Sequence, residues 1–291
     1  MRACRGFDRT VKFSLIIATF GRSAELERLL ESLVLQDQAA LEVIVVDQNR
    51  DDRVRQVLAA FKERLPIIHR VSEPGATRAR NVGLALASGD IIGFPDDDCW
   101  YPEGVLARIS DFFATSQEWD GIIGHTVDAA GNTTLPWSDR AGRLSPAMSW
   151  RRSVTYVYFL RRHAALAVGG FDETLGPGAG TPWGAGDDND FMLRALKTGA
   201  RVYFDPRLAV HHPPLFPAFD GESLDKRERY ARADGRVLRK HPMPLWWMLA
   251  FFGVPLARWM LSLLAMDPAR RKFHWITFRG RIRGYRDRPA E

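Results

Sequence analysis

The sequence contains little cysteine: only Cys4 and Cys99 among 291 residues. So few cysteines cannot build the disulfide framework of a small secreted domain, and we therefore expect a reducing compartment. The first nine residues also lack the apolar run of a signal peptide. The first apolar segment, residues 13–20, is too short to cross a membrane. These absences predict a cytoplasmic protein.

Motifs that define several large enzyme classes are missing as well. The chain has no Gly-Lys-Ser/Thr phosphate loop, no dinucleotide-binding glycine pattern and no nucleic-acid-binding motif. A phosphatase with an aspartate nucleophile would carry Asp-x-Asp-x-Thr after its first strand, where this chain has Thr19-Phe-Gly-Arg22. A nucleotidyltransferase would need a glycine-rich loop with a lysine at the same place. We expect none of these activities and no nucleic-acid partner.

What the sequence does contain is a regular alternation of short apolar runs and helical patterns. Runs typical of buried strands are followed by leucines and valines at helical spacing. This alternation predicts an α/β fold with a mostly parallel sheet that helices cover on both faces. The strands are predicted at residues 13–20, 41–47, 67–71, 91–94, 121–126 and 154–160, with a pair of short strands at 201–204 and 208–212.

Three consecutive aspartates, Asp96, Asp97 and Asp98, follow the fourth of these runs. Pro95 ends the run, so the carboxylates should lie at the strand's carboxyl end, where open α/β sheets bind ligands. Neighbouring carboxylates repel one another, and a hard divalent cation that bridges them to a substrate phosphate would relieve this repulsion. The pattern therefore favours a Mg²⁺ or Mn²⁺ site over a solvated acidic turn.

Five short motifs are spaced along roughly residues 13–212. In order, they are Ile-Ile-Ala-Thr-Phe-Gly-Arg22, Val-Asp47, Ala-Arg-Asn-Val-Gly83, Gly-Asp90 and Phe-Pro-Asp-Asp-Asp98. This series resembles the family 2 glycosyltransferases, which have the GT-A fold and transfer a sugar from a nucleotide-sugar donor. The resemblance implies a GT-A (Rossmann-like) catalytic domain over residues 1–220. Its nucleotide-binding half would cover about 13–100 and its acceptor half about 101–220.

Several residues of the nucleotide-binding half gain roles from this resemblance. Thr19 and Asp47 would line the nucleoside pocket, with Asp47 accepting a hydrogen bond from the base. Asp90 would support the nucleotide pocket, or else cap the turn before its own strand. Arg78 and Arg80 lie in the first turns of a predicted helix, where they would bind phosphate; the alternative for both is a solvated helix face.

The resemblance also suggests how the metal would be held. Asp96 and Asp98 resemble the family's Asp-x-Asp pair, with Asp96 near the ribose and metal and Asp98 on the metal. Because three aspartates are consecutive, which two act stays open, and Asp97 remains a candidate donor-binding residue. His211 stands where relatives often place a histidine near the metal or diphosphate, and we favour it over His212. A solvated histidine pair is the alternative.

A second acidic run, Asp187-Asp-Asn-Asp190, begins another predicted helix after a glycine-rich segment. Capping alone would explain carboxylates at a helix N-terminus. Sugar transfer with inversion also needs a carboxylate that takes the proton of the attacking hydroxyl. The run resembles the family's Glu-Asp-x-Asp motif, which implies Asp188 as the base and leaves Asp187 as its alternative. Trp183 would stack on a sugar or anchor the packing.

Positive charge is concentrated in the C-terminal tail. The net charge of the chain is +6, whereas residues 222–291 alone hold sixteen Lys or Arg against seven Asp or Glu. A charged helix is predicted over 222–240, and an apolar stretch containing Pro255 and Arg258 over 245–266. Basic residues beside an apolar stretch favour an anionic membrane surface. Three interpretations stay open: a helix pair, broken at the proline, in the lipid interface; a spanning helix; or a dimer or core contact.

Residues and resemblance together predict an inverting, metal-dependent glycosyltransferase using Mn²⁺ or Mg²⁺ and a UDP-linked sugar. The acceptor would be a glycan, lipid-linked or other hydroxyl in the synthesis of cell-surface glycan or glycolipid. Arg80 or His211 would assist the departing diphosphate. The enzyme would be cytoplasmic or peripheral on the inner face of the cell membrane, with a homodimer as a further expected partner. A catalytically inactive nucleotide-sugar-binding module at a membrane is the alternative, and the presence of Asp188 argues against it.

Overall fold

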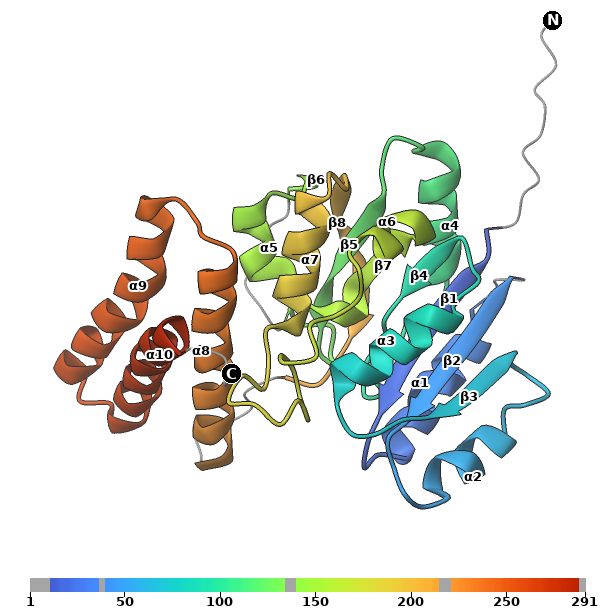
Figure 1. Cartoon of the computed structure of the whole chain (residues 1–291), viewed down its shortest axis with the longest axis horizontal. Coiled ribbons are helices and arrows are strands. Elements are labelled where there is room, and N and C mark those ends of the chain that lie inside the picture. The colour runs from blue at the N-terminus through green and yellow to red at the C-terminus, as the bar shows by residue number, and fades with distance from the viewer. Residues whose placement is uncertain (1–10, 37–39, 134–139, 215–220, 288–291) are drawn as a thin grey trace, which may run out of the picture.

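The computed structural model describes residues 11–36, 40–133, 140–214 and 221–287. The expectations for Cys4, for the first nine residues and for the domain boundary near residue 220 fall outside this part. Among the described residues, eight strands form one sheet in the order β3-β2-β1-β4-β7-β5-β8-β6 (Figure 1). The strands are β1 (Phe13–Thr19), β2 (Leu41–Asp47), β3 (Ile67–Val71), β4 (Ile91–Gly93), β5 (Gly121–Val127), β6 (Gly142–Arg143), β7 (Tyr158–Arg161) and β8 (Val202–His211).

Helices cover both faces of this sheet, which confirms the predicted α/β fold class (Figure 1). The pairings among β3, β2, β1 and β4 are all parallel, as is β5 with β8, whereas β7 and β6 pair antiparallel with their neighbours. The helices up to residue 200 are α1 (Ala24–Val34), α2 (Arg53–Ala59), α3 (Ala76–Leu86), α4 (Val105–Thr115), α5 (Pro146–Arg152), α6 (Arg162–Ala167) and α7 (Asp187–Lys197), with a 3₁₀ turn at Thr155–Val157.

The core forms where the apolar runs of the sequence meet. All but one of the seven residues of β1 are buried, and β2 is buried along its whole length. A strand buried on both faces has no polar side to alternate with, so its sequence reads as a continuous apolar run. The leucines of α1 at helical spacing are buried too. As a result, the polar residues just after these strands are held rigidly at one edge of the sheet.

The prediction of two short strands at 201–204 and 208–212 is wrong, because a single strand, β8, covers this region. Its pairing with β5 shifts register between Ile123, which pairs with Phe204, and His125, which pairs with Ala209. Four residues of β8 therefore lie opposite a single residue of β5. They include Asp205 and Pro206, which suggest a turn in the sequence. A bulge accommodates a proline, which has no N–H to contribute to the ladder.

Three helices stand side by side at one end of the molecule, shown in orange and red in Figure 1: α8 (Gly221–Lys240), α9 (Leu245–Leu264) and α10 (Pro268–Arg286). Helices α8 and α10 cross closely at glycines. A Cβ on Gly235 would lie 2.1 Å from the Arg281 carbonyl oxygen, and one on Gly284 would lie 1.8 Å from that of Arg232. No larger side chain fits at such a crossing.

The predicted break at Pro255 is wrong, because α9 runs through the proline without interruption. A proline in a helix leaves the carbonyl four residues earlier without its N–H partner. Here that carbonyl belongs to Phe251, and Arg281 Nη1 donates a hydrogen bond to it at 2.5 Å. A side chain from α10 therefore replaces the missing backbone donor.

Helix α8 is also joined to α7, the helix that follows the glycine-rich segment. The Asp190 carboxylate is fully buried and lies 2.6 Å from Lys240 Nζ and 2.9 Å from His241 Nε2. Gly186, directly before α7, has a φ of +79°, and a Cβ there would lie 2.9 Å from the Val237 side chain. Ala233 and Val237 of α8 pack in one apolar cluster with Trp183. Helix α8 is thus packed directly against the start of α7.

Candidate active site

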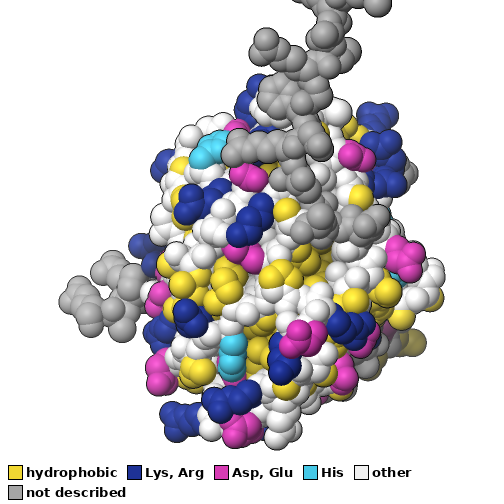
Figure 2. Space-filling model, turned by 90° about the vertical axis from the view of Figure 1, so that its right-hand side faces the viewer, with side chains coloured by type: hydrophobic (Ala, Val, Ile, Leu, Met, Phe, Trp, Pro, Cys, Tyr) yellow, Lys and Arg dark blue, Asp and Glu magenta, His cyan; other side chains and the backbone are white. Residues whose placement is uncertain are grey.

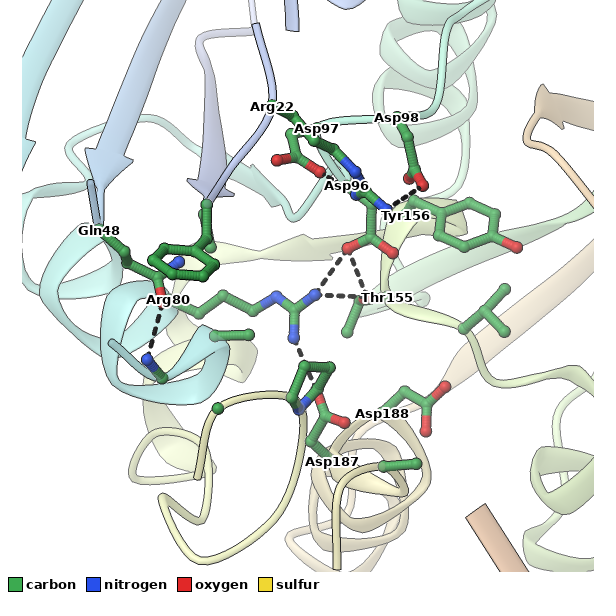
Figure 3. Close-up of a pocket in the computed structure, with 18 of the residues that line it drawn as sticks. Arg22, Gln48, Arg80, Asp96, Asp97, Asp98, Thr155, Tyr156, Asp187 and Asp188 are labelled. Carbon is green, nitrogen blue, oxygen red and sulfur yellow. Dashed lines mark hydrogen bonds and ion pairs between the residues drawn. The ribbon is translucent and has the colours of Figure 1, made fainter. Parts of the chain in front are cut away.

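A pocket with a volume of about 400 Å³ opens at the carboxyl ends of β1, β2 and β4. One wall comes from residues that follow these strands, including Gln48 and the aspartates of 96–98. The opposite wall comes from the start of α7 and from α8. Figure 3 shows Gln48 at one end of this arrangement, Asp188 toward the other, and the consecutive aspartates along one side. The position is the ligand crevice expected for an open α/β sheet.

Two of the three consecutive aspartates gather with a histidine. One ligand atom each of Asp96, Asp98 and His212 lies within 4.8 Å of the others, and His212 Nε2 is 3.2 Å from Asp98 Oδ1. Although burial opposes it, the bond to His212 lowers the pKa of Asp98. Two carboxylates and an imidazole are ligands that Mn²⁺ and Mg²⁺ accept. The residues present therefore fit a divalent cation.

The histidine in this cluster is His212, whereas the sequence favoured His211. His211 is the last residue of β8 and His212 follows it, and the two side chains have different neighbours. His211 at the end of β8 turns away: its Nδ1 lies 2.8 Å from the Asp128 carbonyl oxygen, and its ring stacks on Trp100. His212 stacks on Tyr156, which also lines the pocket. The structure thus places His212, rather than His211, beside Asp96 and Asp98.

Asp97 has a different environment from its two neighbours. Its buried carboxylate forms an ion pair with Arg22, which also reaches Asp98 Oδ2 at 2.9 Å. Burial raises the pKa of Asp97, and Arg22 opposes that rise. Asp97 therefore holds Arg22 in place while Asp96 and Asp98 face His212.

Arg80 crosses from α3 to the far wall of the pocket, as Figure 3 shows. Its buried guanidinium lies 2.6 Å from both Asp96 Oδ1 and Asp187 Oδ2. Although burial opposes it, these carboxylates raise the pKa of Arg80. Arg78 is instead exposed and pairs with Glu173 at 3.2 Å, and it is not among the residues that line the pocket. The structure thus brings one of the two predicted phosphate-binding arginines to the site.

The acidic residues of α7 divide into three environments. Asp187 is buried and held by Arg80, while Asp188 lines the pocket and is partly exposed. Burial, and next the neighbouring Asp187 carboxylate, raise the pKa of Asp188 well above its ordinary value. Asp190 points away from the pocket toward Lys240. Burial raises the pKa of Asp187 as well, but Arg80 is bonded to that carboxylate. Asp188 is therefore the best placed of the three to accept a proton.

The remaining predicted residues lie farther from the pocket. Thr19 and Asp47 are buried at the ends of β1 and β2, and Asp47 accepts hydrogen bonds from the Asn49 backbone and side chain. The residue after it, Gln48, lines the pocket. Asp90 stands at the opposite end of β4, where its carboxylate accepts a bond from the Lys12 backbone N–H at 3.1 Å. These contacts agree with the alternative that Asp90 holds the turn before its strand.

Sequence reasoning assigned no role in the site to several pocket-lining residues. Arg22 and Gln48 lie in or directly after quoted motifs, so their place along the chain could have suggested them. Lys226 and Tyr230 belong to the charged helix α8, where nothing in the spacing distinguishes them from solvated neighbours. The missed residues are Arg22, Gln48, Tyr156, Lys226 and Tyr230.

The pocket carries an excess of negative charge. Five carboxylates line it, against the three cations Arg22, Arg80 and Lys226 and one histidine. Such an excess around a concave site favours a bound divalent cation and a ligand whose phosphates complete its coordination. The carboxylates are Asp96, Asp97, Asp98, Asp187 and Asp188.

Comparison with known proteins agrees with this geometry. The chain is 26% identical over 261 residues to the succinoglycan biosynthesis protein ExoM of Rhizobium meliloti. The aligned part covers 84% of this chain and 82% of ExoM. The match to this chain spans less than half the length of two other curated relatives: 43% of one and 31% of the other.

Two solved structures show the same fold. One is the mannosyltransferase PcManGT from Pyrobaculum calidifontis in complex with GDP-Man and Mn²⁺. Its TM-score is 0.67 at 16% sequence identity, and the match covers 96% of this chain and 88% of that chain. The other is S. aureus TarS 1-349 in complex with UDP-GlcNAc, with a TM-score of 0.60, 18% identity, and 94% and 91% covered. These likenesses confirm the predicted GT-A fold.

Residues 14–166 match the family described as glycosyl transferase family 2. This segment is more than half of the chain, and it includes β1 apart from Phe13, β2, β4 and the three consecutive aspartates. The chain therefore belongs to glycosyl transferase family 2.

Proposed function

We propose that the protein is an inverting, metal-dependent glycosyltransferase that uses a nucleotide-diphosphate sugar and a hydroxyl acceptor. The family membership supports sugar transfer from a nucleotide sugar in general. The observation that carries the finer proposal is that two chemical groups face one pocket from opposite walls. The Asp96, Asp98 and His212 cluster stands on one wall, and Asp188 stands on the other.

Asp96, Asp98 and His212 would hold Mn²⁺ or Mg²⁺. The bound ion supplies positive charge that offsets the charge developing on the departing diphosphate. Around it, the protein's own residues keep the carboxylates in place: Arg22 fixes Asp98, and Arg80 fixes Asp96. Mn²⁺ in the PcManGT complex supports a divalent ion for this fold without deciding between the two metals.

Asp188 would act as the general base. In an inverting transfer, the acceptor hydroxyl oxygen forms a bond to the anomeric carbon while the bond from that carbon to the diphosphate breaks. The hydroxyl proton passes to the base as the new bond forms. A carboxylate whose pKa is raised binds that proton more strongly than an ordinary aspartate does. Asp187 is less suited, because Arg80 already occupies one of its oxygens.

The nucleotide is proposed to be uridine diphosphate, as in the UDP-GlcNAc complex of TarS, although PcManGT binds GDP-Man. The test is to incubate the purified protein and Mn²⁺ with UDP- and GDP-linked sugars and to follow donor hydrolysis. We expect slow, Mn²⁺-dependent release of UDP from a UDP-sugar. Release of GDP alone would overturn the choice of nucleotide. Binding of UDP with no turnover, with or without sugar acceptors, would instead favour the inactive binding module.

We further propose that the protein works at an anionic membrane surface, with a glycan or lipid-linked acceptor in cell-surface glycan synthesis. The name of ExoM, a succinoglycan biosynthesis protein, supports that pathway class. Helix α9 is, within the described ranges, the one helix long and apolar enough to cross a membrane. Its exposed apolar residues are Leu245, Trp246, Leu249, Val254, Met260, Leu261, Leu263 and Leu264.

The packing of α9 favours a helix lying in the membrane surface over a helix spanning it. The inner face of α9 packs against the rest of the protein. The rings of Trp247 and Phe251 contact the Trp150 ring, and Arg281 donates a hydrogen bond to the Phe251 carbonyl oxygen. Insertion across a bilayer would break these contacts. The side of the molecule away from α9, shown in Figure 2, mixes basic, acidic and apolar side chains.

Basic residues near the exposed face of α9 would meet the lipid headgroups. Four exposed basic residues lie on α9 or in the first turn and a half of α10: Arg258, Arg270, Arg271 and Lys272. Each basic residue near an anionic surface contributes about 1 kcal/mol of binding, and a helix with one apolar and one basic side suits the interface.

Vesicle flotation tests this membrane proposal. Leu249→Glu should reduce flotation with anionic vesicles, whereas Leu35→Glu should not, although the two leucines are 65% and 60% exposed in the parent. Neutral vesicles should bind the parent weakly, and a high-salt or alkaline carbonate wash should release it. Retention after the carbonate wash would indicate a spanning helix. Equal flotation of both variants with the parent would rule out the α9 face.

A further inference from the structure

The residues of the proposed metal cluster come from strands that are not neighbours in the sheet. Asp96 and Asp98 follow β4 and His212 follows β8, and two strands, β7 and β5, lie between β4 and β8. Neighbouring strands are about 4.8 Å apart, so β4 and β8 are separated by about 14 Å across the sheet. The three ligand atoms nevertheless lie within 4.8 Å of one another. A contact outside the strand ladder therefore has to hold Asp98 beside His212.

An isolated antiparallel bridge between Trp100 and His211 supplies such a contact. The Trp100 N–H donates a hydrogen bond to the His211 carbonyl oxygen at 3.1 Å, and the His211 N–H donates one to the Trp100 carbonyl oxygen at 3.0 Å. Trp100 is two residues after Asp98, and His211 directly precedes His212. The bridge thus joins the two segments that carry the ligands, right next to the ligands themselves.

The side chains at this bridge stack on one another. Residues directly opposite in an antiparallel pair project to the same side, and the Trp100 and His211 rings are parallel within 3° with their centres 4.9 Å apart. The Arg28 guanidinium lies 3.8 Å from the centre of the Trp100 ring, and its Nη2 donates a hydrogen bond to the Asp98 carbonyl oxygen at 3.0 Å. A single bridge has no flanking ladder to support it, so these side-chain contacts strengthen the hold on Asp98.

We propose that Trp100 is a positioning residue for the divalent cation. By stacking on His211 and contacting Arg28, the Trp100 ring keeps Asp98 at the distance from His212 at which both bind one ion. Trp100 is not among the residues that line the pocket, so it acts through the ligands and not on the donor. The inference rests on the proposed function, because it assumes that this cluster binds a divalent cation.

Electron paramagnetic resonance tests the inference directly, because Mn²⁺ loses the sharp signal of the free ion when it binds to a protein. The full-length parent, Trp100→Leu and Trp100→Phe are titrated with Mn²⁺ alone, with Mn²⁺ and UDP, and with Mn²⁺ and GDP. Phenylalanine keeps an aromatic ring that can stack on His211 and contact Arg28, whereas leucine removes the ring.

Trp119→Leu is the matched control for the loss of a tryptophan. Trp119 is half-buried like Trp100, and it also has one aromatic and one cationic neighbour. Its ring centre is 5.1 Å from that of Tyr203, and the Arg201 guanidinium lies 5.2 Å from it. Trp119 is not a pocket-lining residue. The two leucine variants therefore lose similar packing, but only one of them loses a contact beside the metal ligands.

We expect Trp100→Leu to weaken Mn²⁺ binding by about tenfold, the lower end of the range for groups that orient metal ligands. The loss stays short of that for Asp98→Asn, because all three ligands are still present. Trp100→Phe should keep most of the affinity, and Trp119→Leu should match the parent. Unchanged Mn²⁺ affinity in Trp100→Leu, or an equal loss in Trp119→Leu, would overturn the inference.

Asp98→Asn separates that failure from a failure of the proposed function. If the parent binds Mn²⁺ and Asp98→Asn does not, the metal site stands whatever Trp100→Leu does. If the parent binds no Mn²⁺ in any titration, or if Asp98→Asn binds it equally well, the metal site and the inference fail together.

Thermal melts verify that each variant is folded, and Arg28→Met replaces Trp100→Leu if the latter is not. Arg28 is exposed, and the loss of its guanidinium should weaken Mn²⁺ binding by about threefold. Arg64→Met is the control for this variant, because the Arg64 guanidinium lies 5.3 Å from the centre of the Phe61 ring. Equal Mn²⁺ affinity of Arg28→Met and the parent would then overturn the inference.

Discussion

Replacing Asp190 with asparagine should destabilise the protein. The carboxylate is fully buried and contacts three cationic or titratable groups. Lys240 Nζ lies at 2.6 Å, and Arg194 Nε and His241 Nε2 lie at 2.9 Å. Two of these partners come from the C-terminal end of α8 or just beyond it, so Asp190 is a main electrostatic link between α7 and the tail.

The expected cost follows from the burial of the charge and the exposure of its partners. Removing one member of a fully buried ion pair costs about 3–5 kcal/mol, because the partner stays buried and uncompensated. Here Lys240 and Arg194 are each 24% exposed, so water stabilises them in part. Asparagine also still accepts one hydrogen bond. We therefore expect Asp190→Asn to lower the free energy of unfolding by about 2–4 kcal/mol.

Urea unfolding followed by tryptophan fluorescence measures this loss. Glu31→Gln is the matched control, because it removes a carboxylate whose pair with Arg64 is about half exposed. Exposed pairs contribute about 0–1 kcal/mol. If Asp190→Asn loses no more free energy of unfolding than Glu31→Gln, the reasoning about the buried link is refuted.

The same link predicts an acid dependence with a definite sign. Burial by itself would raise the pKa of Asp190. The hydrogen bond from His241 and the charges of Lys240 and Arg194 together outweigh burial, so the pKa is lowered. A carboxylate whose pKa is lower in the folded state stabilises the fold fully above its unfolded pKa of about 3.9. That stabilisation is lost as the pH falls from there through the folded pKa. The stability difference between parent and Asp190→Asn should therefore be constant near neutral pH and shrink below about pH 4.

Two further predictions concern the chemistry of the pocket. Asp188→Asn should lower turnover by about 10²–10⁴-fold with unchanged UDP affinity, because the amide cannot accept the hydroxyl proton; full turnover in this variant together with a dead Asp187→Asn would move the base to Asp187. His212→Gln and Asp98→Asn should each weaken UDP binding in Mn²⁺ to the level seen with a chelator, whereas His211→Gln should not. Equal UDP affinity of the parent with Mn²⁺ and with a chelator would contradict the metal site.

Much of the site could be predicted from the sequence because its residues follow directly after buried strands or begin a helix. The position of Asp96–Asp98 at a strand end follows from the apolar run of 91–94, and the strand–helix alternation predicts parallel strands, whose carboxyl ends lie at one edge of the sheet. The acidic run at residue 187 likewise marks the start of a helix. In each case a local pattern, with no distant contact, determines where the side chain lies along the chain.

Other features depended on contacts between segments far apart in the sequence. The choice of His212 over His211 depends on contacts with distant segments: His211 bonds the Asp128 carbonyl oxygen and stacks on Trp100, whereas His212 lies against Asp98. Helix α9 runs through Pro255 because Arg281 from another helix supplies a donor to the Phe251 carbonyl. Lys226 enters the pocket only because α8 docks against α7. Local sequence fixes the type of an element and the order of its residues, whereas packing between elements decides which side chains meet.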